Sequence, residues 1–426
     1  MTETAHPLFF KVNPGKVMLF FFLVFPVAVD LLNGFLTFIL GLDFSVGVFY
    51  RGFLLISSIP VFILHKDKMW KLYVSIIITL WLISCIIWAG TGNLQIIKET
   101  MNFVKMLYPF IIIPLIVHIV RKYEVEVDYL AGCAVTYCAI AGGSIIFSLL
   151  TGLGIEFSAS KYSFGAKSFF VAQNDIGLSM LIGYTLSLYL FFKNFSFKYF
   201  IAAVFIMAGL IGLSTRTGIM GAVGVFVFLV VAIMFYGKRS VNINYIAKSF
   251  IFLFFALVVT VGTIKVIQLV SEYEYMLTKF QTLAYEHPRQ NLFEAAHNRI
   301  AGRHWIYNVF GEGMIRYKLE VGNRMIGIYQ VSAEGQLAEV DYIDLMGYYG
   351  LVMTVLILAF PVYAFLKILI LFLMERRFED MILVLCMTVF LIHSFLAGHA
   401  IISPLVSTIM VVIYTCIFYF KKIKFA

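Results

Sequence analysis

Uninterrupted apolar runs recur along almost the whole of this 426-residue chain. A bilayer core requires about 20 such residues per helical span, because no water is present there to bond with the backbone. Runs such as 111–120 and 225–235 do not alternate at every second residue, which excludes a transmembrane β-barrel. Only 13% of the residues are charged and 62% are hydrophobic. The sequence therefore predicts an all-α, polytopic membrane protein.

The runs place about 12 transmembrane helices in a single integral membrane domain over residues 1–426. Lys11 and Lys16 precede the first run, which contains Asp30 and has no signal-peptide cleavage site, so we expect a retained first helix. The expected spans are 17–40, 44–64, 70–90, 103–120, 129–151, 171–192, 198–213, 217–236, 249–270, 342–370, 381–399 and 402–420.

Basic residues fix the expected orientation of these spans. With the N-terminus inside, every cytoplasmic segment is basic, including the tail at 421–424. This bias explains the net charge of +9 without a nucleic-acid partner. Both termini are then cytoplasmic, and residues 271–340 form one large extracytoplasmic loop between spans 9 and 10. A shorter outer loop at 152–170, rich in Gly, Ser and aromatic residues, is a candidate mobile lip.

No metal or cofactor site is predicted. The five cysteines all lie inside apolar runs, without metal-ligand spacing, and we interpret them as packing residues. Glu339 and Asp341 form an alternative carboxylate pair for a metal, but two-acid motifs are common by chance. Arginines can also neutralise an anionic substrate unaided.

The long loop is rich in arginine. It contains Arg289, Arg299, Arg303, Arg316 and Arg324, together with His287, His297 and His304. A planar guanidinium holds phosphate oxygens with two parallel hydrogen bonds, which suits a diphosphate. The alternative is a solvated loop whose glutamates pair with these bases.

Two further places have candidate functional residues. Arg216 lies in the tight outer turn 214–218 between two apolar spans, where its alternative role is to reach lipid headgroups. The chain re-enters the membrane at 338–350, where Glu339, Asp341 and Asp344 offer a general base. The alternative there is an acidic first turn that complements the helix dipole.

Three local patterns resemble the superfamily of O-antigen polymerases and O-antigen ligases, the Wzy-type and WaaL-type proteins. These are Asn174-Asp175-Ile176-Gly177 at a helix start, the serine-arginine turn 213–218, and the run from Gly302-Arg303-His304-Trp305 to 341–350. The resemblance covers nearly the whole chain. In the ligases the last motif begins with histidine-asparagine, whereas this chain has Glu339 and Val340.

The resemblance implies a GT-C-like membrane glycosyltransferase that uses an undecaprenyl-diphosphate-linked donor and needs no metal. It implies that Arg216 and Arg303, assisted by Arg299 or Arg289, hold the departing diphosphate. Glu339 would take the proton of the attacking hydroxyl. Substrate-binding roles then fall to Asn174, Asp341, His304 and Trp305.

The predicted function is polymerisation of a surface polysaccharide (O-antigen, capsule or exopolysaccharide) at the outer face of a bacterial cytoplasmic membrane. Its partners would be the lipid-linked donor and acceptor, membrane lipids, and a chain-length regulator and flippase of the same pathway. The alternative is a ligase that transfers the finished glycan to lipid A core or another acceptor. A transporter is a lesser alternative, suggested by Asp30, Arg51, Lys105 and Lys265 in or beside apolar segments. We expect Lys105 and Lys265 to be structural, with stems that reach water.

Overall fold

The regular structure of the described residues is helical. In a computed structural model these residues are 13–42, 45–90, 95–155, 165–240, 288–324 and 337–420; the side chains of residues 216, 233–240, 288, 289 and 420 are not described. Eight of the described helices are long and apolar enough to cross a membrane, and three shorter helices are also apolar. The all-α, polytopic fold class is confirmed.

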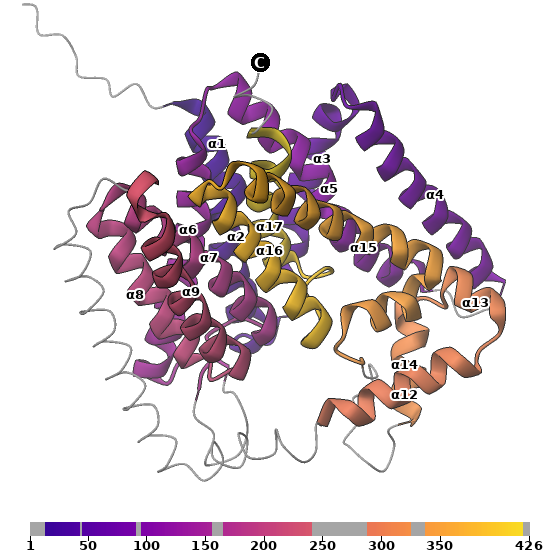
Figure 1. Cartoon of the computed structure of the whole chain (residues 1–426). Helices are drawn as coiled ribbons and strands as arrows, with labels where there is room; N and C mark the ends of the chain where they lie inside the picture. Colours follow the sequence, from indigo (N-terminus) through magenta and orange to yellow (C-terminus); the bar gives the residue numbers. More distant parts are fainter. Residues whose placement is uncertain are drawn as a thin grey trace, which may run out of the picture.

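The helices follow the predicted spans closely (Figure 1). They are α1 (Pro14–Leu23), α2 (Phe25–Phe38), α3 (Val46–Leu64), α4 (Lys68–Ala89), α5 (Ile96–Lys122), α6 (Val127–Thr151), α7 (Gln173–Asn194), α8 (Phe197–Gly212), α9 (Arg216–Ser240), α15 (Asp341–Glu375), α16 (Phe378–Leu396) and α17 (Pro404–Thr415), which a π-helical turn η1 (Cys416–Phe420) extends. α1 and α2 together occupy the first predicted span. The predicted span at 249–270 and Lys265 lie outside the described residues.

α7 lies at the centre of the bundle. Its most apolar window is entirely buried, and α5 is the next most buried span, whereas α3 and α4 are largely exposed. The hydroxyls of Ser179 and Thr185 on α7 donate to carbonyls one turn earlier, to Asp175 at 2.9 Å and Leu181 at 3.0 Å. A polar side chain inside the membrane domain is tolerated when it is satisfied locally in this way.

Small residues bring α6 and α8, two helices that pack on α7, close to each other. A Cβ on Gly209 of α8 would lie 2.5 Å from the Cα of Gly142 on α6, which no real side chain tolerates. Such glycine contacts let helix backbones approach without a side chain between them. The five cysteines are free and buried, as expected for packing residues.

Three helices of the predicted long loop pack together at one end of α15: α12 (Pro288–Gly302), α13 (Trp305–Phe310) and α14 (Met314–Arg324) (Figure 1). Gly350 interrupts α15 with φ 77° and ψ 178°. A Cβ there would lie 2.3 Å from the carbonyl oxygen of Val309, so only glycine admits α13 at this distance. We call this end of the bundle, where α7, α9 and α15 begin, the loop end.

Candidate active site

The first turn of α15 is tied to the segment that joins α16 and α17. Asp341 accepts a hydrogen bond from the hydroxyl of Ser394 at 2.7 Å and from the backbone amides of Ala400 at 3.0 Å and Ile401 at 3.3 Å. Its residue surface is only 3% exposed. Through these bonds Asp341 fixes segment 397–403. Its contact with substrate stays a prediction.

Glu339 is the most accessible of the three acids at this turn. Its side chain is half-buried, whereas Asp341 and Asp344 are buried. Its backbone is left-handed, with φ 57°, an uncommon conformation for a residue with a side chain. Asp344 helps to hold this strain by accepting from the amide of Ala338 at 3.0 Å. Gly398, itself at φ 64°, lies so close that a Cβ there would reach 2.4 Å from the carbonyl carbon of Glu339. Both sides of Glu339 are therefore fixed.

The start of α7 approaches the same segment. Asp175 is buried, and its carboxylate interacts with the side chain of Ser403 and lies in electrostatic range of Asp341. Asn174, one residue earlier, is half-buried at this end of the helix. Segment 397–403 thus joins the helix-start motif at 174–177 to the acidic turn at 339–344.

The serine-arginine turn packs on the other side of the first turn of α7. Gln173 donates its side-chain amide to the carbonyl of Leu213 at 2.5 Å. A Cβ on Gly177 would lie 3.7 Å from the hydroxyl oxygen of Thr215. Arg216, the first residue of α9, therefore begins its helix beside Asn174, and its side chain is not described.

Three arginines of α12–α14 surround one glutamate, and we call Arg299, Arg303 and Arg316 with Glu312 the arginine cluster. Arg299 donates two hydrogen bonds to Glu312, through Nε at 3.1 Å and Nη2 at 2.5 Å. Arg303 lies 3.5 Å and Arg316 3.7 Å from the same carboxylate, whose side chain is fully buried. Glu320 also pairs with Arg299, at 3.4 Å. The loop glutamates therefore do pair with these bases, as the alternative interpretation of the loop supposed.

Arg303 is the most enclosed member of this cluster. Its guanidinium donates to the carbonyls of Gly347 at 3.0 Å and Met346 at 2.8 Å on α15, and to the Asn308 side chain at 2.8 Å. Burial lowers the pKa of Arg303 and the charge of Glu312 opposes this, but an arginine remains charged at neutral pH. Most of its donors already have partners, so these contacts favour a positioning role. Its direct contact with a diphosphate stays a prediction.

Burial also acts to lower the pKa of Arg299, but the hydrogen bonds and charge of Glu312 outweigh it and raise that pKa. The guanidinium of Arg299 is therefore held by Glu312 in its charged form. Like Arg303, it is engaged by carboxylate within the protein before any substrate binds.

The other predicted loop residues belong to the same subdomain, and His304 and Trp305 are exposed. His304 caps α13, accepting from the amide of Ile306 at 3.4 Å. Trp305 is 66% exposed. Arg289 lies in the first turn of α12, and its side chain is not described. Substrate binding by these residues stays a prediction.

Glu99 and Trp88 attach this subdomain to the bundle, and sequence reasoning did not identify either. Glu99 of α5 accepts from the amides of Met314 at 3.0 Å and Ile315 at 2.9 Å, which caps the N-terminus of α14. Trp88 of α4 donates its indole N–H to the carbonyl of Gly311 at 2.9 Å. The available signal was an acid just before an apolar span, at the start of the helix, where it is costly to bury unless it is hydrogen-bonded.

The three sequence motifs thus converge at the loop end. Segment 397–403 joins Glu339 to the start of α7, and the turn at 213–215 joins Arg216 to that same start. Arg303 joins the arginine cluster to the second turn of α15. Among the described contacts, none joins Arg303 directly to Glu339. The site is therefore built from three elements that α7 and α15 hold in place.

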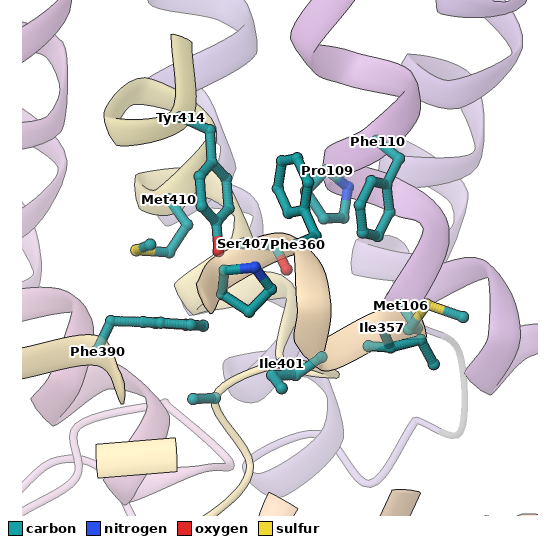
Figure 2. A pocket seen from close by; sticks show the side chains of 12 residues that line it. Met106, Pro109, Phe110, Ile357, Phe360, Phe390, Ile401, Ser407, Met410 and Tyr414 are labelled. Carbon is teal, nitrogen blue, oxygen red and sulfur yellow. The ribbon is translucent and has the colours of Figure 1, made fainter. Parts of the chain in front are cut away.

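A small apolar cavity lies deeper in the bundle, between α5, α15, α16 and α17 (Figure 2). Its walls include Met106, Phe360, Ser407 and Tyr414, and its volume is about 30 Å³. That volume is near the space of a single water molecule and cannot hold a lipid chain.

A family model described as O-antigen ligase like membrane protein matches residues 13–300, more than half of the chain. The matched region contains Asn174 and Arg216, and Arg303 and Glu339 follow it. No curated protein matches the chain. The resemblance drawn from the three motifs is confirmed. The chain belongs to the family of O-antigen ligase like membrane proteins.

Proposed function

We propose that this protein is a glycosyltransferase that transfers a polyprenyl-diphosphate-linked glycan to a hydroxyl acceptor at the loop end of the bundle. The observation that carries the proposal is the placement of Glu339. This half-buried carboxylate lies on a strained backbone, and segment 397–403 links it to the start of α7. α9 with Arg216 begins beside that start. Family membership supports an enzyme of this class.

In the proposed reaction Glu339 accepts the proton of the acceptor hydroxyl. The oxygen then attacks the anomeric carbon, a new glycosidic bond forms, and the bond from that carbon to the diphosphate oxygen breaks. The electron pair leaves with the polyprenyl diphosphate, and attack from the opposite face inverts the anomeric centre. The strained backbone of Glu339 is held by its neighbours, which favours a fixed position for the carboxylate. A fixed base is useful because proton transfer requires the carboxylate to lie within hydrogen-bonding distance of the hydroxyl.

Arg216 is the residue we assign to the departing diphosphate. It is the first residue of α9, and the amides of a helix N-terminus add a favourable field for an anion. Arg303 and Arg299 act in this proposal by fixing α12–α14 against α15, because Glu312 and backbone carbonyls already engage them. Arg289, Asn174, His304 and Trp305 remain proposed contacts for the glycan or the diphosphate.

Polymerisation is the preferred form of this activity, with a lipid-linked repeat unit as acceptor. The specific observation is that Glu339 and Val340 stand where the ligases have histidine and asparagine. We place the site on the outer side of a bacterial cytoplasmic membrane with both termini inside, because the basic segments lie at the opposite ends of the helices.

The decisive experiment supplies purified protein with a synthetic polyprenyl-diphosphate glycan and measures chain extension. Wild-type protein should extend the glycan, and Glu339→Gln should reduce the rate by about 100-fold or more, since it keeps the shape of the side chain but removes its basicity. Full activity of Glu339→Gln would show that another residue is the general base. Absence of transfer by wild-type protein, despite intact folding, would reject the function.

Deleting the gene separates the two forms of the activity. Loss of long polysaccharide chains indicates a polymerase. Long chains that persist on the lipid carrier indicate a ligase.

A further inference from the structure

A second group of cations lies within the bundle, away from the arginine cluster. Lys105 is on α5, a predominantly buried span, and its side chain is half-buried. It lies in electrostatic range of Arg51 from α3, Lys318 from α14 and Asp175 from α7. We call Lys105, Arg51 and Lys318 the inner cation group.

Lys105 has no direct partner in the described part of the chain: it makes neither a hydrogen bond nor a salt bridge there. The acids around the inner cation group are each engaged by another group. Asp30 pairs with Arg51 at 2.7 Å, Glu99 accepts the amides of α14, and Asp175 interacts with Ser403. An ammonium has three donors, and desolvating it without direct partners is costly in a membrane protein.

Lys105 lies further along α5 than Glu99, the residue that caps α14. From position 99, which caps α14, to position 105 the helix advances about 9 Å at ~1.5 Å per residue. Lys105 is therefore slightly deeper than the helix N-terminus of α14. Its neighbour Lys318 belongs to α14, which begins at that cap. Asp175 belongs to the helix start that segment 397–403 joins to the acidic turn at 339–344.

We propose that Lys105 directly binds a phosphate oxygen of the lipid-linked substrate on the membrane-facing side of the site, with Arg51 and Lys318 adding to the local field. The inference rests on the proposed function and extends it to a residue inside a span. It replaces the expectation that Lys105 is a structural side chain reaching water. The ammonium would supply the point charge that Arg303, engaged by carbonyls, no longer offers.

The test uses full-length protein in nanodiscs of phosphatidylcholine, titrated with undecaprenyl diphosphate. Lys105→Met should weaken binding by about tenfold or more and raise the KM for the lipid-linked donor similarly, because one charge-assisted contact is lost. Lys98→Met is the matched control: it removes the same charge from the same helix, at an exposed position, and should leave both values unchanged. Lys105→Arg keeps the charge and should retain most of the binding.

A second titration with phosphatidylglycerol distinguishes the sources of phosphate. Preference for undecaprenyl diphosphate that depends on Lys105 supports the proposal, whereas equal Lys105-dependent binding of both lipids overturns it in favour of a general headgroup site. If wild-type protein transfers glycan but Lys105→Met keeps its affinity and KM, only this inference fails. If wild-type protein does not transfer glycan, the proposed function fails.

Lys105→Gln serves as a second variant. Loss of a monodisperse folded peak in both Lys105→Met and Lys105→Gln would make Lys105 structural and overturn the proposal.

Discussion

The arginine cluster and the inner cation group both gather positive charge near the loop end, but they differ in what surrounds that charge. In the arginine cluster a fully buried Glu312 side chain faces three guanidiniums, and backbone carbonyls of α15 take further donors of Arg303. In the inner cation group Lys105 has only electrostatic neighbours among the described residues. Every arginine of the first region has a direct partner, whereas Lys105 in the second has none among the described residues.

The difference shows that the number of arginines in a loop is a poor guide to where substrate binds. A guanidinium can bind a phosphate or fasten two helices, and the same fork geometry suits both tasks. Burial and existing partners decide between them. In our proposal the cluster positions the site, and Lys105 and Arg216 contact the anionic substrate.

Glu312→Gln should have the largest effect, because it removes the charge that balances the arginine cluster. Breaking a buried pair from one side costs ~3–5 kcal/mol, because the remaining buried charges lose the charge that balances them. We expect a large fall in the unfolding temperature in detergent, together with loss of activity. Glu320→Gln is the control, since its side chain is 37% exposed and its pair with Arg299 should contribute less than ~1 kcal/mol. Equal, small effects of both changes would show that the cluster is not what holds α12–α14.

Arg303→Lys separates positioning from phosphate binding. Lysine keeps the charge but cannot reproduce the fork that reaches two carbonyls and Asn308 at once. We expect a loss of ~1–3 kcal/mol of stability, with activity falling in proportion. Thermal unfolding and chain extension measured on the same preparation check this. Normal stability with a raised KM for the donor would return Arg303 to the list of substrate contacts.

Glu99→Gln weakens the attachment of α14, which carries Lys318 towards the inner cation group. The two oxygens of Glu99 each accept from one backbone amide, and glutamine replaces one of these oxygens with an NH2 donor. Glutamine also has no charge to interact with the helix dipole. The loss should be ~1–2 kcal/mol, comparable with a buried helix cap. Hydrogen exchange at residues 314–318 should accelerate, while exchange in α7 stays unchanged. Unaltered exchange at 314–318 would show that Trp88 and the arginine cluster suffice to hold α14.

Most of the fold could be predicted, because a span is a property of local composition. Eight long and three shorter apolar helices account for eleven of the twelve predicted spans, although the sequence did not show that α1 and α2 divide the first span at Val24, or that Gly350 interrupts α15. Such breaks depend on what packs against the helix. Gly350 is needed because α13 lies against it, and nothing within 342–370 indicates that contact.

The site could be predicted in its motifs but not in the roles of its residues. The helix start at Asn174, the turn at Arg216 and the acids near 340 are local patterns, and the structure brings these segments together. Whether an acid supports the structure or faces substrate depends on partners far along the chain. Asp341 binds an amide 59 positions away, and Glu99 binds one 215 positions away. Lys105 could not be distinguished from a snorkelling lysine until α3, α7 and α14 were placed around it.

Trp305→Ala should have the smallest effect. It tests whether an exposed ring close to the arginine cluster contacts the substrate. Trp305 follows the buried Arg303 by two positions but is exposed, so its removal leaves no cavity and should change stability by less than ~0.5 kcal/mol. If its ring packs on the glycan, KM for the donor should rise about fivefold, corresponding to ~1 kcal/mol for an aromatic contact. Leu319→Ala, at another exposed apolar position of the same subdomain, is the control and should leave KM unchanged. A rise in KM for Trp305→Ala alone would mean that the cluster positions this ring for substrate, whereas unchanged KM in both would leave the cluster with the sole task of fastening α12–α14 to α15.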